Sequence, residues 1–232
     1  MDQLPLPLTL PTTGGFDSFV VDGNVEAVTA IKRWAEGDGD DYLYLHGAAG
    51  SGKSHLLQSA CLRAAKRGGS TSYLPLDRDG LVPAVLDDLD QRDVVVIDAL
   101  QTIAGDPAWE RPLFGLYNDL KDAGRRLLIG ARVPPPALGL GLSDLTSRLC
   151  AGPAYALRPL DDAGRAQLLA NGAEQRGLRL DQAAVSYILT RCPRDAASLL
   201  GLLDDLDRLS LARQRPLNVR LIGELLAERA VQ

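Results

Sequence analysis

A glycine-rich segment, GAAGSGKS, occupies residues 47–54. It follows a short apolar run at 42–45 and precedes a stretch with helical apolar periodicity at 54–66. Between a strand and a helix, such glycines let backbone N–H groups turn inward around phosphates, and the helix N-terminus adds partial positive charge. Lys53 can reach the β- and γ-phosphates, and the Ser54 hydroxyl can bind Mg²⁺. The sequence therefore predicts a P-loop that holds a nucleotide.

A second candidate site residue is Asp98, which directly follows the aliphatic run VVVI at 94–97. Such a β-branched run is typical of a central parallel strand buried on both faces. In P-loop proteins this strand delivers one carboxylate to the Mg²⁺ shell, the Walker B position. ATPases of this type commonly carry a second acid at the following position, but here it is Ala99. We therefore expect the chain to hold nucleotide and to hydrolyse it poorly by itself.

The pattern of elements around these residues predicts the fold class. Strands are expected at 42–45, 71–74, 94–98 and 126–130, and helices at 24–36, 54–66, 81–89 and 113–123. This alternation predicts an α/β fold with a doubly wound parallel sheet. After Pro159 only helices are expected, at roughly 161–176, 181–191, 194–213 and 218–229. The predicted divisions are an extended tail at 1–15, a nucleotide-binding α/β domain at 16–159 and a helical lid subdomain at 160–232.

Bulk composition narrows the class of protein. The net charge of -5 argues against direct sequence-specific binding of DNA through a basic surface. The three cysteines lie far apart without metal-ligand spacing, which favours a reducing compartment. No apolar run reaches the length of about 18 residues that spans a membrane. We therefore expect a cytoplasmic protein that does not enter membranes.

Four segments together resemble one known family. The segments at 16–21, 47–56 and 96–105 resemble the AAA+ core of the bacterial replication initiator DnaA. The segment LSDLTSRL at 142–149 resembles the arginine-finger box of that family. The resemblance covers about 16–230 and implies a P-loop AAA+ fold with a helical lid.

The resemblance also implies roles for individual residues. The adenine side would be lined by 16–21, including Phe16, Val20 and Val21. ADP or ATP would be held by Gly47, Gly50, Ser51, Gly52, Lys53, Ser54, His55, Asp98 and Arg194, with Ser54 and Asp98 on Mg²⁺. Arg148 would be an arginine finger that acts in trans, on nucleotide held by another protein.

Three positions depart from the family pattern. Ala99 replaces the second Walker B acid. The sensor 1 strand lacks its small polar or acidic residue, and Arg132 stands at about that place. In the lid, Ala197 stands where the sensor 2 arginine is expected, and Arg194 is the candidate substitute. All three departures weaken hydrolysis by the chain itself, and none affects the finger.

The tail resembles the short peptide by which partners dock on the sliding clamp, the β subunit of DNA polymerase III. Its clamp-binding residues would be Gln3, Leu4, Leu6 and Leu8. The chain ends where the lid ends, so we expect no separate DNA-binding domain. A DnaA-like core with such a tail resembles the Hda family, regulatory inactivators of DnaA. The resemblance implies a negative regulator of replication initiation that, nucleotide-bound and clamp-tethered, stimulates hydrolysis of DnaA-bound ATP.

Two other functions stay open at this point. One is an independent AAA+ ATPase, such as a helicase or transposase loader. The other is a scaffold in which nucleotide only stabilises the fold. Ala99 and the tail favour the regulator, and a clamp-binding assay separates it from the other two. Self-association, common among AAA+ proteins, is left open, as is the nucleotide bound.

Overall fold

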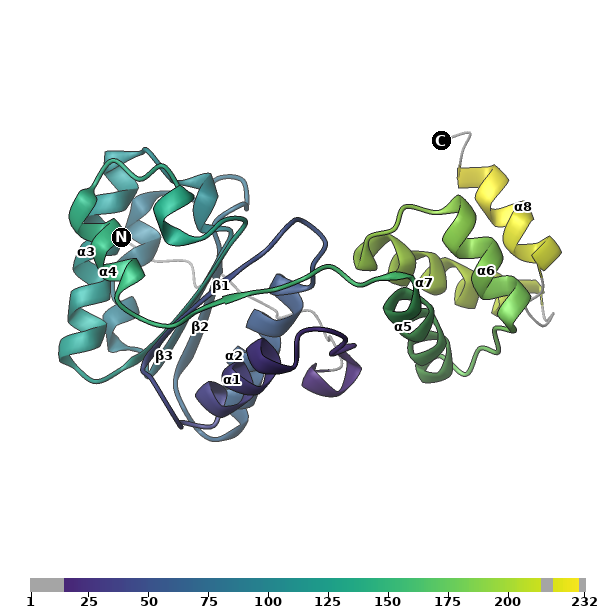
Figure 1. The fold of residues 1–232 in the computed structure, drawn as a ribbon, viewed down its shortest axis with the longest axis horizontal. Helices are drawn as coiled ribbons and strands as arrows, with labels where there is room; N and C mark the ends of the chain where they lie inside the picture. The colour runs from purple at the N-terminus through teal and green to yellow at the C-terminus, as the bar shows by residue number, and fades with distance from the viewer. Residues whose placement is uncertain (1–14, 214–218, 230–232) are drawn as a thin grey trace. The chain divides into compact units, whose positions relative to one another are not determined.

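The computed structural model describes residues 15–213 and 219–229, which form two compact units (Figure 1). The first unit comprises 15–48 and 52–158, and the second comprises 49–51, 159–213 and 219–229. The predicted clamp peptide at 3–8 lies outside the described residues. Within the described part of the chain, no helix combines the length and apolar character needed to cross a membrane.

A five-stranded sheet forms the centre of the first unit, with strand order β2-β3-β4-β1-β5 and parallel pairing throughout. Its strands are β1 (Tyr42–His46), β2 (Thr71–Pro75), β3 (Val94–Asp98), β4 (Arg126–Ala131) and β5 (Ala154–Ala156). The predicted parallel sheet is thus confirmed. Every residue of β3 is buried, as its β-branched composition requires. The edge strand β5 was not predicted, because its sequence AYA is only three residues long and has no β-branched residue.

Helices cover both faces of this sheet (Figure 1). On one face lie α1 (Val25–Ala35) and α2 (Lys53–Lys66), which pack Trp34 and Leu56 against alternate strand residues such as Val96. On the other face lie α3 (Pro107–Asp122) and α4 (Ser143–Cys150), which pack against Ile97 and its neighbours. The sheet is therefore wound on both sides, as predicted. Short 3-10 turns complete the unit: η1 (Gly15–Ser18), η2 (Pro83–Leu86), η3 (Leu89–Gln91), η4 (Leu100–Thr102) and η5 (Pro135–Ala137).

The helix predicted at 81–89 is wrong. The structure has only the two turns η2 and η3 there, separated by Asp87 in an extended conformation and Asp88 at φ 62°. Pro83 lacks a backbone N–H and forces Val82 to be extended, so a helix cannot begin before it. The left-handed Asp88 then stops any continuation.

A second difference concerns α3, which starts at Pro107 instead of 113. The side chain of Asp106 accepts a 2.9 Å hydrogen bond from Ala108 N–H, which is an N-cap followed by proline at the first helical position. Pro112 is accommodated inside the helix.

The second unit consists of helices, as predicted: α5 (Asp162–Gln175), α6 (Gln182–Arg191), α7 (Ala196–Arg213) and α8 (Val219–Arg229). Aspartates cap three of them at the N-terminus. Asp161, Asp181 and Asp195 each accept a backbone N–H three residues on, at 2.8, 2.7 and 2.9 Å. Buried aliphatic side chains form the core, including Leu169, Ile188, Leu199, Leu202, Leu203, Leu206 and Ile222.

Candidate functional site

The predicted phosphate loop joins the carboxyl end of β1 to the start of α2. Gly50 and Gly52 have φ values of 74° and 92°, a left-handed conformation that glycine adopts without strain. A Cβ atom on Gly52 would lie 2.8 Å from Cε2 of Phe19. Any other residue at position 52 would therefore be strained in its backbone and crowded by Phe19. The loop leads into the N-terminal end of α2, whose partial positive charge suits an anion.

Lys53 is the first residue of α2 and is only 8% exposed. Its ammonium group donates hydrogen bonds to the carbonyl oxygens of Gly47 (2.7 Å) and Ala48 (2.8 Å). Burial lowers the pKa of Lys53, and the nearby Asp98 carboxylate opposes that shift. Ser54 follows at the exposed second position of α2. A buried cation, an exposed hydroxyl and a glycine cradle together fit the phosphates of a nucleotide and its Mg²⁺.

Asp98 ends β3 and is 5% exposed. Its Oδ2 accepts a 2.9 Å hydrogen bond from the Tyr73 hydroxyl, and its Oδ1 accepts a 2.8 Å bond from the N–H of Ala99. Gln58 donates to the Tyr73 oxygen at 3.2 Å. Tyr73 was not among the predicted site residues. It lies two residues before Pro75, the partner of Asp98 in the neighbouring strand, so both side chains leave the same face of the sheet.

The position beside Asp98 on the other neighbouring strand is Gly130. Ile97 pairs with Ile129, and a Cβ on Gly130 would lie 3.1 Å from Asp98 Oδ1 and would overlap Cδ1 of Leu57. No side chain therefore fits beside the carboxylate from β4. Arg132 is exposed just past the end of β4, where its backbone N–H donates to Gln101 Oε1 at 3.0 Å.

The segment at 16–21, predicted to lie on the adenine side, follows Gly15 and is held against α2. The His55 Nε2 lies 2.9 Å from the Gly15 carbonyl oxygen, and its ring lies 5.8 Å from that of Phe19. Burial lowers the pKa of His55, which favours the neutral ring. Val20 is buried, and both Phe16 and Val21 pack against the core between α1, α2 and the sheet.

Arg148 lies on the exposed side of α4, while Leu145 and Leu149 of the same helix are fully buried. The two leucines belong to the core on the α3 side of the sheet, whereas the phosphate loop leads into α2 on the other side. Within the described residues, Arg148 makes no ion pair, not even with Asp144 one helical turn earlier. Its charge acts on Tyr117: burial raises the pKa of Tyr117, and the Arg148 guanidinium opposes that shift.

Arg194, the predicted substitute for the sensor 2 arginine, precedes α7 in the second unit. Its guanidinium lies 3.3 Å from the carboxylate of Asp162, which also pairs with Arg165 at 2.7 Å. The Arg194 side chain is 61% exposed, so this ion pair constrains it weakly. Ala197 lies in the first turn of α7.

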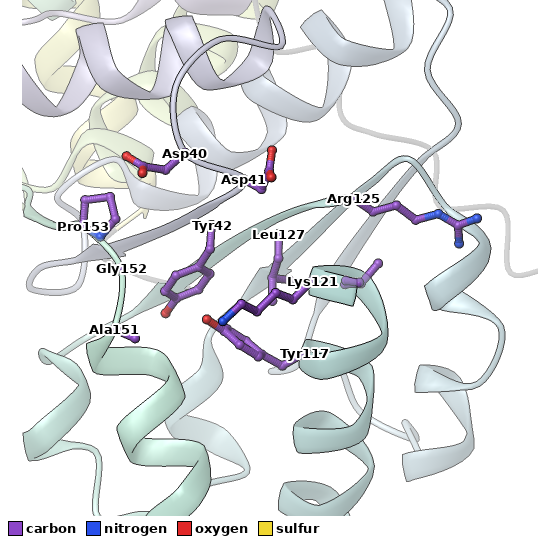
Figure 2. A pocket seen from close by; sticks show the side chains of 11 residues that line it. Asp40, Asp41, Tyr42, Tyr117, Lys121, Arg125, Leu127, Ala151, Gly152 and Pro153 are labelled. Atoms are coloured by element: carbon purple, nitrogen blue, oxygen red, sulfur yellow. The ribbon is translucent and has the colours of Figure 1, made fainter. Parts of the chain in front are cut away.

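A pocket of about 260 Å³ lies at the edge of the sheet where β1 and β4 begin, opposite the phosphate loop (Figure 2). Tyr42 and Tyr117 meet edge to face inside it, with ring centroids 5.2 Å apart. Both acidic and basic side chains lie at its rim, so the charge of the pocket does not favour either an anionic or a cationic ligand. Its lining residues are Asp40, Asp41, Tyr42, Tyr117, Leu120, Lys121, Arg125, Leu127, Ala151, Gly152 and Pro153. The described residues contain no cluster of His, Cys, Asp or Glu that forms a metal site by itself.

Residues 10–155 match the family model of the bacterial DnaA ATPase domain. The chain belongs to the DnaA ATPase family. The predicted family and fold are therefore confirmed, with the P-loop and Walker B segments inside the match. Residues 162–226 match a second model, the lid domain of Hda. The helices of the second unit are thus similar to the lid of Hda, a DnaA-like AAA+ protein.

Solved structures agree on the fold. Domain III of the Thermotoga maritima replication initiation protein DnaA superimposes with a TM-score of 0.80 at 23% identity, over 92% of this chain and 95% of that one. AMPPCP-bound DnaA from Aquifex aeolicus superimposes with a TM-score of 0.72 at 23% identity, over 84% of this chain and 65% of that one. The Thermotoga maritima RuvB Holliday junction branch migration motor superimposes with a TM-score of 0.67 at 20% identity, over 91% of this chain and 70% of that one. A replication initiator DnaA bound to AMPPCP and single-stranded DNA is longer, and this chain covers 64% of it.

Proposed function

We propose that this DnaA-family chain binds ADP or ATP and acts as a negative regulator of replication initiation. In this role it presents Arg148 to ATP held on DnaA and accelerates hydrolysis there. The match of 162–226 to the Hda lid, next to a DnaA ATPase domain, supports a regulator related to DnaA. The AMPPCP-bound DnaA structures support an adenine nucleotide as the ligand class.

In this proposal the chain's own nucleotide is held more than it is consumed. The ammonium group of Lys53 and the first-turn N–H groups of α2 bind the phosphates, and Ser54 and Asp98 hold Mg²⁺, which neutralises phosphate charge. Ala99 offers no base for the attacking water, and Gly130 offers no polar group beside Asp98. Both absences favour slow hydrolysis by the isolated chain.

The observation that carries the regulator proposal is the exposure of Arg148 without an ion-pair partner among the described residues. Because α4 and α2 cover opposite faces of the sheet, the guanidinium suits a nucleotide on another molecule. A guanidinium is permanently charged and forks onto phosphate oxygens. An arginine finger of this kind accelerates phosphoryl transfer by about 10³–10⁵.

Tethering to the sliding clamp completes the proposal and rests on the sequence of the tail. Gln3 would place its amide in a polar pocket, and Leu4, Leu6 and Leu8 would fill an apolar groove of the clamp. The intervening prolines extend the peptide in advance, which lowers the entropy lost on binding. The proposed place of action is the cytoplasm, where DnaA and the clamp are found.

The decisive experiment measures hydrolysis of DnaA-bound ATP in the presence of DNA-loaded clamp. We expect Arg148→Ala to keep its fold, its nucleotide and its clamp binding but to lose the stimulation. Arg92→Ala removes an exposed arginine from another part of the first unit and is the matched control, with stimulation at the level of the unaltered protein. Full stimulation by Arg148→Ala would remove the mechanism.

A second experiment tests the tether. The double variant Gln3→Ala, Leu4→Ala should lose clamp binding and retain nucleotide binding. Unchanged clamp affinity would remove the tether from the proposal. If, in addition, the isolated chain turned over ATP at about 1–10³ per second, the independent loader ATPase would be the better function.

A further inference from the structure

Glu110 is a buried carboxylate that sequence reasoning did not single out. It lies in the first turns of α3 and is 1% exposed. Its Oε1 accepts hydrogen bonds from the backbone N–H groups of Gly105 (2.7 Å) and Gly141 (3.0 Å), and its Oε2 accepts one from Leu142 (2.7 Å). No cationic side chain pairs with it in the described part of the chain. Three backbone donors, together with the N-terminal end of α3, therefore compensate the buried charge.

The three donors come from two segments far apart in the sequence. Gly105 ends the connection that follows Asp98 and β3, whereas Gly141 and Leu142 end the connection between β4 and α4. Leu142 is the N-cap residue of α4, and its apolar side chain cannot cap the helix itself. Glu110 thus binds the backbone at the point where α4 begins.

The other end of α4 is also tied to the body of the domain. The hydroxyl of Tyr42, whose ring lines the pocket in Figure 2, donates a 3.1 Å hydrogen bond to the carbonyl oxygen of Leu149. Arg148 lies between these two ties. With Leu145 and Leu149 buried beneath it, the helix has little freedom as long as both ties hold.

We propose that Glu110 is a positioning residue for Arg148. Its carboxylate fixes the N-terminal end of α4 to the segment that follows Asp98, so the exposed guanidinium is held in one place for the partner's nucleotide. Preorganisation of this kind matters because a charge aimed at a transition state loses effect when it moves. The consequence for hydrolysis rests on the proposed function, whereas the positioning of α4 does not.

The first test is Glu110→Gln, studied in the full-length chain by amide hydrogen exchange. In either orientation of the new amide, at least one of the three backbone N–H groups faces an NH₂ donor instead of an oxygen. Exchange at Leu142 and at 146–150 should accelerate about tenfold or more, while amides of α2 keep their rates. Glu110→Asp, which keeps the charge but is too short to reach all donors, should show a smaller acceleration and serves if the glutamine variant does not fold.

The second test compares stimulation of DnaA-bound ATP hydrolysis by the same variants. We expect Glu110→Gln to reduce it about tenfold with nucleotide and clamp binding unchanged, and Tyr42→Phe, which releases the other end of α4, to reduce it as well. The positioning role would be overturned if Glu110→Gln left amide exchange at 142–150 unchanged. It would also be overturned if Glu110→Gln kept full stimulation of hydrolysis while Arg148→Ala lost it. If Arg148→Ala also kept full stimulation, the proposed arginine-finger role would be wrong. The amide-exchange result alone would then show whether Glu110 positions α4.

Discussion

The hydroxyl of Tyr73 on β2 donates a 2.9 Å hydrogen bond to Oδ2 of Asp98 at the end of β3. Because Ala99 N–H engages Oδ1, each oxygen of this buried carboxylate has one protein donor. The carboxylate is thereby fixed in orientation, with its remaining lone pairs available to a metal ion. Burial raises the pKa of Tyr73, so the phenol stays protonated and keeps donating.

Tyr73→Phe removes this donor and keeps the ring. The buried Asp98 is left with an unsatisfied oxygen, so we expect the free energy of unfolding to fall by about 1–3 kcal/mol. Urea unfolding of the nucleotide-free protein measures the change. Gln58→Leu is the control, since it leaves the bond to Asp98 in place and should cost less. Equal stability of Tyr73→Phe and the unaltered protein would mean that the hydrogen bond contributes nothing net.

Lys53→Ala should abolish thermal stabilisation by ADP or ATP. A ligand that binds the native state raises stability by about 2.7 kcal/mol at 100 times its dissociation constant, so the unaltered protein should show a clear rise in Tm. The variant also loses two hydrogen bonds to the loop carbonyls of Gly47 and Ala48, so its own Tm should be lower without nucleotide. A normal nucleotide-induced rise in Tm for the variant would contradict the assignment of the phosphate site.

The stability of the helical unit should depend on acid pH through Asp195. Hydrogen bonds from the backbone N–H and hydroxyl of Ser198 hold the pKa of Asp195 below its ordinary value of 3.8. The folded state therefore binds this proton less readily than the unfolded state. The stabilisation is fully present above pH 3.8 and is lost as the pH falls through the folded-state pKa.

The variants that isolate this effect are Asp195→Asn and Asp195→Ala. Asparagine caps α7 without titrating, so this variant should show a weaker dependence on pH below about 4. Alanine removes the cap and should cost about 1 kcal/mol at neutral pH. Unfolding followed by circular dichroism across the acid range measures both, and identical acid profiles for the unaltered protein and Asp195→Asn would argue against the cap.

Gly130→Ala should destabilise the first unit by about 1–3 kcal/mol, because the new methyl group would overlap Leu57 and press on Asp98. Gly115→Ala on α3 is a matched control, since a Cβ there meets nothing within 4 Å and alanine favours a helix. The control should be neutral or slightly stabilising. Comparable losses in the two variants would show that crowding beside Asp98 is not the cause.

Local sequence pattern was enough to assign several candidate site residues to the strands, loops and helices on which the structure has them. Residues 47–54 could be placed because a glycine-rich loop of this kind lies between a strand and a helix. Asp98 could be placed because a β-branched run such as 94–97 is typical of a central parallel strand, and Asp98 ends it. The four helical stretches predicted after Pro159 correspond to the helices of the second unit. By contrast, the helix expected at 81–89 failed because Pro83 and the left-handed Asp88 outweighed its apolar spacing.

The contacts that sequence reasoning missed are long-range. Tyr73 meets Asp98 through the register of two strands, and Glu110 meets Leu142 through the packing of α3 beside α4. Neither residue has a distinctive local pattern, since a tyrosine in a strand and a glutamate early in a helix are both ordinary. Gly130 was likewise not singled out, because only the register places it beside Asp98.

Substitutions at Ala99 test most directly why hydrolysis by this chain should be slow. Ala99 has φ 60° and ψ 39°, a left-handed conformation that aspartate and asparagine tolerate better than alanine. Ala99→Asp and Ala99→Asn should therefore both adopt this backbone with less strain than alanine. Because position 99 is 8% exposed and follows the buried Asp98, Ala99→Asp should be the less stable of the two without Mg²⁺. They differ in charge but hardly in shape, so a comparison between them isolates the carboxylate.

Ala99→Asp should supply a base next to Asp98, the proposed Walker B aspartate. General base catalysis contributes about 10²–10⁴ in rate, and we expect the lower end, about 10²-fold over Ala99→Asn, because no side chain from Gly130 orients the attacking water. Phosphate release from the isolated protein measures turnover, with Lys53→Ala subtracting any contaminating ATPase. The two variants should bind nucleotide equally, since neither touches the phosphate loop. If Ala99→Asp hydrolysed ATP no faster than Ala99→Asn, the missing acid would not be what limits hydrolysis, and the placement of the nucleotide relative to β3 would have to account for it.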